Sequence, residues 1–395
     1  MRIRFLDSED RQAAARRAGL EERIGALWRS ISVVSEDSEK LVQVARRELA
    51  GIHPELGCEL WTEDEGGTRR LALSVRGQPC LRPLARAVMN GAPELPGIAL
   101  SGERPALKLG RALERARASA GLELRNTRVR AGFTRGHLLA IAIHDAAFRG
   151  ADPEQARRAS ELVCEGVLGE RVLDDWVESV AAVPLAGGGS LPVLNPGAEP
   201  AALAPISELA NRVHAGIEGV LAGLPERPCH QRHREGEWTM FETQPERADD
   251  WPEQDDLLMA TTSMPEMLKS FLQGSPFYSG RFSRHRERFC YLKLDAAGLD
   301  GRARLEQRSL LEDAFDRALV PEGLGCVVGN GFGVRYSYVD LALVDPENSL
   351  ERVRRVAREL GAPERSWFLF CDAELACEWL PVWPGAPAPP GLSEA

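Results

Sequence analysis

Hydrophobic and polar positions alternate most regularly in the last hundred residues of the chain. Short runs with a two-residue period predict β-strands, and apolar side chains spaced three and four residues apart predict amphipathic helices. In chain order, the predicted elements are a strand at 288–295, a helix at 306–320, strands at 326–329 and 332–344, a helix opened by Asp345-Pro346-Glu347, and a strand at 367–371. Asn330-Gly331 predicts a type I′ hairpin turn between the middle strands, because both residues tolerate positive φ.

This βαββαβ order makes residues 286–383 resemble the ferredoxin-like fold, in which both helices lie on one face of a four-stranded antiparallel sheet. The more aliphatic side of the 332–344 strand is expected to face the helices. Tyr336, Tyr338 and Asp340 are then expected on the other, open face, near Tyr291. An open aromatic face can serve as a binding platform. The alternative is that the same aromatics pack against the preceding domain.

The first half of the chain predicts a mixed α+β domain. Residues 70–75 alternate as a strand does, and residues 137–144 form an apolar run that suits a buried strand, with further alternation over 122–129. Asp152-Pro153-Glu154-Gln155 has the residues of a helix start. The apolar stripe that follows keeps helical spacing as far as Val180, which predicts one long helix.

Glycine and proline dominate residues 186–205 without any period, and this composition predicts a linker. The chain then divides into an N-terminal α+β domain at 1–185, the linker at 186–205, a helical and irregular connector at 206–285, a ferredoxin-like domain at 286–383 and a flexible tail at 384–395. The predicted fold class is α+β, with a mixed N-terminal domain followed by a ferredoxin-like C-terminal domain.

Charge and composition limit the kinds of molecule that the protein is expected to bind. The chain has 395 residues, with 49 Lys+Arg against 59 Asp+Glu and a net charge of −10. Nucleic acids and anionic membranes attract positive fields, so an acidic protein is expected to bind neither broadly. No apolar stretch has the length of a membrane span, and the first ten residues become acidic before any apolar run. We therefore expect a soluble, cytoplasmic protein of bacterial type.

The eight cysteines are scattered singly, mostly in apolar runs, which predicts free thiols and no disulfide framework. One segment has candidate metal ligands: Cys229 and His233 have a C-x3-H spacing, and His285 and Cys290 follow about fifty residues later. Arginines flank this segment and no compact second pair follows. A charged loop without metal is therefore the favoured interpretation, and no cofactor is expected.

Gly331-Phe332-Gly333 is similar to the third-strand signature of RNA-recognition-motif domains. The neighbouring residues Asn330, Val334 and Arg335 depart from that signature, and the last domain is itself acidic. RNA binding on the C-terminal sheet therefore ranks third among the predicted functions.

Motifs for nucleophilic catalysis, zinc proteolysis and nucleotide phosphate binding do not occur in the sequence. The leading prediction is a non-enzymatic protein-binding module: a regulator, an adaptor or an immunity-type inhibitor. The predicted binding surface consists of Tyr291, Tyr336, Tyr338, Asp340 and the basic residues Arg281 and Arg284. The alternative is an enzyme with an interdomain acid/base or zinc site.

Overall fold

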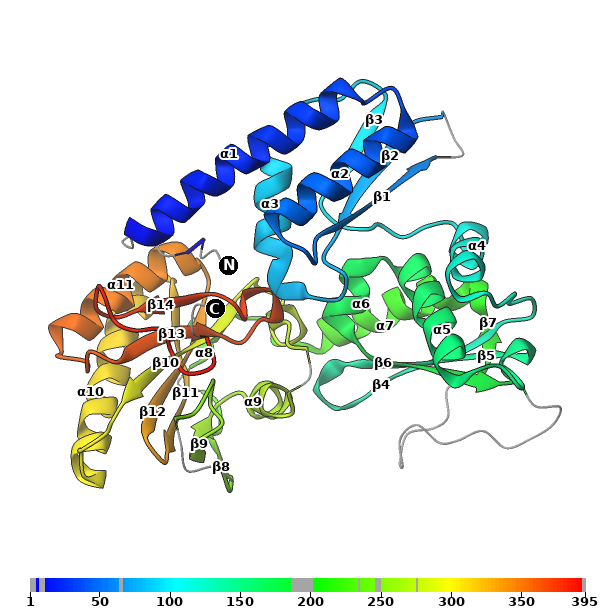
Figure 1. The fold of residues 1–395 in the computed structure, drawn as a ribbon. Coiled ribbons are helices and arrows are strands. Elements are labelled where there is room, and N and C mark those ends of the chain that lie inside the picture. Colours follow the sequence, from blue (N-terminus) through cyan, green and yellow to red (C-terminus); the bar gives the residue numbers. More distant parts are fainter. Residues whose placement is uncertain are drawn as a thin grey trace. The chain divides into compact units, whose positions relative to one another are not determined.

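The chain forms two compact units, Ile24–Gly223 and Met1–Arg23 with Leu224–Ala395 (Figure 1). The structure is a computed structural model that describes residues 5–6, 11–63, 67–185, 202–233, 235–245, 250–274 and 276–392. Both units combine helices and strands, which confirms the α+β class. Helix α1 (Arg11–Val33) begins in the second of these units and ends in the first.

The Ile24–Gly223 unit contains a three-stranded sheet in the order β1-β2-β3. Its elements are α2 (Ser38–Ile52), β1 (Gly57–Thr62), β2 (Arg69–Ser74), α3 (Arg82–Asn90) and β3 (Ile98–Ser101). The strand predicted at 70–75 is therefore confirmed as β2. Trp28 fixes the end of α1 in this unit, since its indole N–H donates to the carbonyl oxygen of Val88 at 2.8 Å.

A four-stranded sheet in the order β6-β5-β4-β7 lies in the same unit. Its elements are α4 (Leu109–Ala120), β4 (Arg128–Phe133), β5 (Leu139–Asp145), α5 (Pro153–Leu168), α6 (Glu170–Trp176), β6 (Val177–Pro184), β7 (Ala204–Pro205) and α7 (Leu209–Gly223). The predicted buried strand is confirmed as β5, whose residues are all buried. The other predicted strand begins later than expected, because β4 starts at Arg128.

The long helix expected from Pro153 to Val180 is interrupted at Gly169 and gives way to a strand at Val177, so the prediction is wrong at these two places. Asp152 caps α5 as predicted, with its carboxylate accepting from the backbone N–H groups of Glu154 and Gln155. The helix ends at Gly169, whose φ is 82°. Val180 lies in β6, which pairs in parallel with β5. The apolar spacing was helical, but backbone pairing with a buried strand determines the structure.

Most of the predicted linker, residues 186–201, lies outside the described residues. The helix after it, α7, belongs to the Ile24–Gly223 unit. Its Gly216 lies so close to the Phe133 ring of β4 that a side chain there would meet ring carbon Cε2 at 2.5 Å. The segment after Leu224 belongs with the last domain, because two of its strands extend the C-terminal sheet.

The second unit is built on an antiparallel sheet of seven strands in the order β14-β13-β10-β12-β11-β9-β8. The strands are β8 (Thr239–Glu242), β9 (Leu257–Thr262), β10 (Arg288–Asp295), β11 (Gly325–Gly333), β12 (Tyr336–Leu343), β13 (Ser366–Phe370) and β14 (Trp379–Pro381). The helices are α8 (Cys229–Arg232), α9 (Pro265–Leu272), α10 (Gly301–Leu319) and α11 (Pro346–Glu359).

Helices α10 and α11 cover one face of this sheet (Figure 1). Val339, Leu341 and Leu343 of β12 pack with apolar residues of both helices. Tyr336 and Tyr338 lie on the opposite face. The predicted assignment of the two sides of this strand is confirmed.

The hairpin turn predicted at Asn330-Gly331 is wrong. Strand β11 runs through both residues, Asn330 pairs with Val339 and Gly331 pairs with Tyr338. The glycine serves a different purpose, because a side chain at Gly331 would meet the Leu257 Cδ1 atom at 2.6 Å. It admits the neighbouring strand β9 and is not needed for positive φ.

The face of the sheet expected to be open is covered, so this expectation is also wrong. The segment that precedes β10 lies across it, with Cys229, Leu257, Met267, Phe277 and Phe282 in one core cluster with the sheet aromatics. The sequence analysis assigns these residues to the helical and irregular connector at 206–285. Their apolar side chains form the second half of the core.

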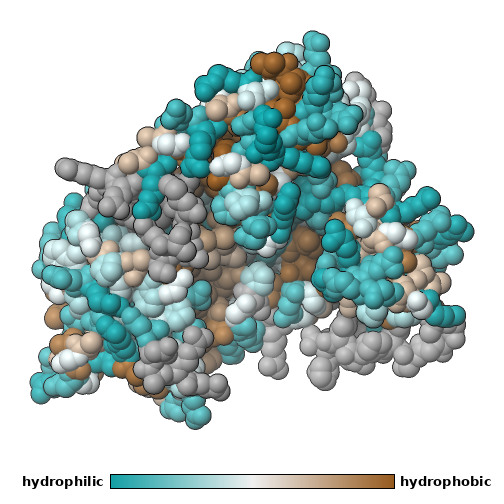
Figure 2. Space-filling view, viewed as in Figure 1, coloured by the Kyte–Doolittle hydropathy of each residue, from teal (hydrophilic) through white to brown (hydrophobic). Residues whose placement is uncertain are grey.

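The stretch from residue 384, expected as a flexible tail, packs against the same cluster as far as it is described. Ala388 and Leu392 contact the cluster, and the Trp367 indole N–H donates to the carbonyl oxygen of Pro387 at 2.7 Å. Figure 2 shows hydrophilic residues over most of the visible surface, with apolar residues gathered in small areas. Among the described residues, no helix combines the length and apolarity needed to cross a bilayer.

Candidate functional site

The structure places the three predicted tyrosines in the core. Tyr291, Tyr336 and Tyr338 are at most 1% exposed. The Tyr336 hydroxyl donates to the Asp250 carboxylate, and the Tyr338 hydroxyl donates to the Asp256 carboxylate. A partner can reach these residues only if the covering segment moves. Protein binding on the tyrosines therefore stays a prediction.

A lysine to which the sequence analysis gave no role, Lys293, holds the segment that covers the aromatic face of the sheet. Lys293 is fully buried, and its ammonium group donates to the carbonyl oxygens of Trp251 and Glu253 at 2.5 and 2.8 Å. It also lies 4.2 Å from the centre of the Tyr336 ring. Burial lowers the pKa of Lys293 to about 8, although nearby carboxylates such as Asp256 oppose this shift.

The other members of the predicted surface do not form one patch. Asp340 is 6% exposed and accepts from the Gln254 amide at 3.0 Å, and burial raises its pKa to about 6. Arg281 is fully buried, with its guanidinium near two phenylalanine rings. Only Arg284 is exposed, and its Nε–H donates to the carbonyl oxygen of Pro225.

The four candidate metal ligands are not brought together. Cys229 and Cys290 lie in core clusters on opposite faces of the sheet. Burial and the neighbouring Glu287 raise the pKa of Cys229 to about 12, whereas zinc binding requires a thiolate. His233 contacts the carbonyl oxygen of His230, and His285 is half-buried. In the part of the chain that is described, no three His, Cys, Asp or Glu side chains are placed to hold a metal ion.

The aromatic residue of the RNA-like sequence is covered by a helix. Arg308 of α10 lies with its guanidinium carbon 3.9 Å from the centre of the Phe332 ring. A second arginine of the same helix, Arg304, lies 5.7 Å from that ring. The ring thus contacts α10 of its own chain.

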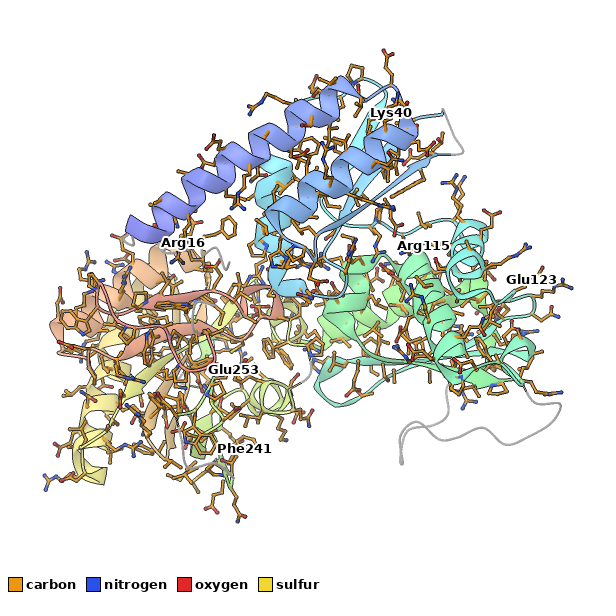
Figure 3. The ribbon with its side chains drawn as sticks, in the orientation of Figure 1. Arg16, Lys40, Arg115, Glu123, Phe241 and Glu253 are labelled. Carbon is orange, nitrogen blue, oxygen red and sulfur yellow. The ribbon has the colours of Figure 1, made fainter. Side chains whose placement is uncertain are left out.

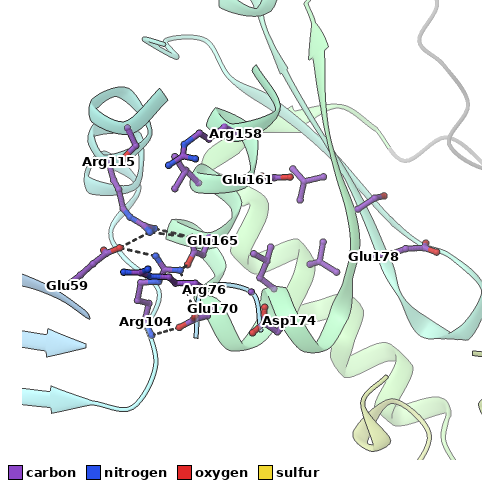
Figure 4. A pocket seen from close by; sticks show the side chains of 17 residues that line it. Glu59, Arg76, Arg104, Arg115, Arg158, Glu161, Glu165, Glu170, Asp174 and Glu178 are labelled. Carbon is purple, nitrogen blue, oxygen red and sulfur yellow. Dashed lines mark hydrogen bonds and ion pairs between the residues drawn. The ribbon is translucent and has the colours of Figure 1, made fainter. Parts of the chain in front are cut away.

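A cavity in the Ile24–Gly223 unit has a volume of about 680 Å³ (Figure 4). Its apolar lining comes mainly from Leu162, Leu173, Val177 and Val180. Its charged lining residues are Glu59, Arg76, Arg104, Arg115, Arg158, Glu161, Glu165, Glu170, Asp174 and Glu178. Arg115, on α4, is also labelled in Figure 3. We call this cavity the charged pocket.

Glu170 is the most buried carboxylate of the charged pocket, at 2% exposure. Its oxygens accept from the Ser74 hydroxyl at 2.9 Å, from the backbone N–H of Val75 at 3.0 Å and from that of Arg104 at 3.1 Å. The preceding residue, Gly169, allows this approach, because a side chain there would meet the backbone nitrogen of Ala106 at 3.0 Å. Glu170 thus joins the part of the unit with the three-stranded sheet to the part with the four-stranded sheet.

Glu165 and Glu59 share two arginines. The guanidinium of Arg104 contacts both carboxylates, and that of Arg115 lies 3.0 Å from Glu59 and 3.4 Å from Glu165. Burial raises the pKa of Glu165, while Arg104 and Arg115 oppose the rise. Figure 4 shows these side chains converging from β1, α4, α5 and the loop before α4.

Asp174 is held in the same way at the other end of the charged pocket. It contacts the buried guanidinium of Arg82, which also lies 3.0 Å from Glu103. Burial raises the pKa of Asp174, and Arg82 opposes this effect. Arg82 comes from the first turn of α3, so the ion pair again ties the two halves of the unit together.

Three charged lining residues have no ion pair among the described residues: Arg76, Arg158 and Glu178. All three are exposed. Arg76 has a φ of 50°, a conformation that is rare for a residue with a side chain, and its backbone N–H donates to the Ser74 hydroxyl. Strained backbone of this kind is found at ligand sites more often than elsewhere.

The arrangement favours binding over proton transfer. Each buried carboxylate accepts from or pairs with arginine or backbone donors, and these contacts favour its ionised form. Among the described residues, the charged groups without an ion pair are the guanidinium groups of Arg76 and Arg158 and the carboxylate of Glu178, at the mouth of the charged pocket. Guanidinium groups bind carboxylate and phosphate oxygens in a bidentate manner.

The sequence analysis assigned no role to any charged residue of the charged pocket. One signal was present: Glu165 interrupts the apolar stripe of α5 on a buried side of the helix. A charged residue at such a position is buried only with a partner, but sequence alone does not identify that partner. In the comparisons with known proteins, no family, no curated protein and no solved structure matches this chain.

Proposed function

We propose that this protein is a binding protein without catalytic activity, and that the charged pocket takes a small ligand bearing a carboxylate or phosphate group. The observation that carries the proposal is the contrast between the buried charges, which are paired, and Arg76 and Arg158 at the mouth, which are not. The ligand's anionic group pairs with these two arginines. Its hydrocarbon part lies on Leu162, Leu173 and Val177.

The test is calorimetric titration of the full chain with succinate and with inorganic phosphate. The wild type is expected to bind at least one of them, and Arg76→Gln combined with Arg158→Gln is expected to weaken binding by at least about tenfold, because a charge-assisted hydrogen bond contributes about 1.5–3 kcal/mol. Arg125→Gln is the matched control, since Arg125 is exposed and already paired with Glu123. Equal affinity of the double variant and the wild type would contradict the proposal, and so would conversion of the bound compound.

A protein partner, the leading prediction from the sequence, is a second candidate function. The observation that favours it is the exposure of Trp238 and Met240, at 44% and 62%, on and beside the edge strand β8. Large exposed apolar side chains on a sheet edge are typical of protein interfaces. A partner recovered by the wild type and by the control Leu310→Glu, but lost with Met240→Glu, would support this function. Leu310 is 58% exposed and lies on α10, which makes it a matched apolar position.

We also propose that β10, α10, β11, β12, α11 and β13 form a ferredoxin-like unit within the larger sheet. The support is the strand order β13-β10-β12-β11 together with two helices on one face. Nuclear Overhauser contacts between β10 and both β12 and β13 test this arrangement. Direct contacts between β10 and β11 would contradict it.

A further inference from the structure

The outer face of the four-stranded sheet in the Ile24–Gly223 unit carries three basic residues: Arg128, Arg130 and His144. Arg128 of β4 pairs directly with His144 of β5, and Arg130 pairs with Ala142. Neighbouring residues along a strand point to opposite faces, and Phe133 of β4 contacts α7. The three basic side chains therefore lie on the face turned away from that helix. We call them the arginine–histidine face.

His144 has no partner for either ring nitrogen, although its side chain is only 2% exposed. The Arg130 Nε atom is also buried without a partner. A buried polar atom without a hydrogen bond costs about 1–3 kcal/mol, so native proteins seldom keep two of them side by side unless something binds there. Burial and then the charge of Arg130 lower the pKa of His144, which fits a site with excess positive charge.

The described carboxylates do not neutralise this face. Arg128 and Arg130 form no ion pair within the described residues. The nearest carboxylate along the chain, Asp145, belongs to the opposite side of β5. There it accepts from the Thr127 hydroxyl at 2.8 Å and from a backbone N–H at 2.9 Å. Among the described residues, no carboxylate therefore balances the positive charges of Arg128 and Arg130.

Small side chains make up most of the rest of this face. The side chains around Arg130 are small (Gly132, Ala140, Ala142 and Ala181), and His144 pairs with Val183 of β6. Gly132 and Arg128 are exposed, so a ligand can approach over β4. None of these residues lines the charged pocket.

We propose that the arginine–histidine face is a binding site for a tetrahedral oxyanion of the phosphate type. The guanidinium of Arg130 donates to two of its oxygens, the His144 ring donates to another, and Arg128 adds charge on the outer side. This inference is independent of the proposed function, because it uses different residues on a different surface of the unit.

The experiment is a titration of the full chain with inorganic phosphate, followed by the ring resonances of His144 in NMR spectra. The resonances, assigned with His144→Gln, are expected to shift and saturate with phosphate and to remain unshifted with chloride at equal ionic strength. Arg130→Gln is expected to weaken binding by at least about tenfold. Arg125→Gln, an exposed arginine just before β4, is the matched control and is expected to bind as the wild type does.

Two further results decide the proposal. Shifts of equal size with chloride and phosphate would overturn it, since they would reflect screening alone. Unchanged affinity in the Arg130→Gln variant would overturn it as well. Arg76→Gln combined with Arg158→Gln is expected to leave the His144 titration unchanged, which separates this site from the charged pocket if either proposal fails.

Discussion

Lys293 offers the sharpest test of the C-terminal core, because it is a fully buried ammonium group between aromatic rings. Burial lowers its pKa from 10.5 to about 8 in the folded protein. Between these two values the unfolded chain keeps the proton and the folded protein releases it. The unfolded state then binds more protons, so the free energy of unfolding rises with pH over this window.

The magnitude follows from the size of the shift. Each pKa unit corresponds to about 1.4 kcal/mol, so the rise between pH 8 and 10.5 amounts to about 3 kcal/mol. Lys293→Met removes the titrating group and keeps most of the side-chain volume. The variant leaves the carbonyl oxygens of Trp251 and Glu253 without their donor, which destabilises it by an amount that does not depend on pH.

The assay is urea unfolding followed by tryptophan fluorescence at several pH values from 7 to 10.5. Trp251 and Trp367 report on this core, since the first accepts a hydrogen bond from Lys293 and the second packs on Tyr336. Cysteine and tyrosine ionisation affect wild type and variant alike, so the difference between them isolates Lys293. Lys269→Met is the matched control, because Lys269 is exposed and paired with Glu266. A constant difference between wild type and Lys293→Met across this range would refute the reasoning.

Three other predictions concern buried groups of both units. Asp340→Asn is expected to stabilise the protein above pH 6 by up to about 3 kcal/mol and to have no effect near pH 4. The pKa of Asp340 rises from the usual 3.8 to about 6 in the folded protein, because burial disfavours its ionised form. Urea unfolding at both pH values checks this. Gly333→Ala is expected to cost about 3 kcal/mol or more in thermal unfolding, because its methyl group would collide with the buried Asp256 carboxylate, whereas the unobstructed Gly301→Ala is expected to be neutral. A thiol reagent is expected to label only the two half-buried cysteines of the native chain quickly, and labelling of all eight before unfolding would contradict the buried thiols.

The parts of the fold that could be predicted from the sequence are those set by local pattern. Strand β12 and helix α11 combine clear periodicity with a start signal, and the Asp345 carboxylate accepts from the backbone N–H of Asn348 as a helix cap does. The two sides of β12 could be distinguished because one is aliphatic and the other aromatic. Each of these inferences needs only residues that are close in sequence.

The charged pocket could not be predicted for the opposite reason. Glu59 and Glu165 are about a hundred residues apart, and they meet only because Arg104 and Arg115 lie between them. Helix α6 could not be predicted as a separate helix either, since its residues continue the apolar stripe of α5 across Gly169. Pairing across such distances depends on tertiary structure, which periodicity does not report.

The packing of the segment before β10 on the aromatic face could be predicted in part. The glycines of β11 are the sequence feature that indicates it. Gly329, Gly331 and Gly333 alternate along one face of that strand, and their neighbours across it are Asp340, Leu257 and Asp256. Three missing side chains in a row on one face mean that another part of the protein approaches the backbone there. The predicted turn at Asn330-Gly331 explains the glycines by positive φ instead. It therefore gives no reason to expect another segment on the neighbouring face. The spacing of two residues distinguishes the explanations, because a type I′ turn needs positive φ at adjacent residues.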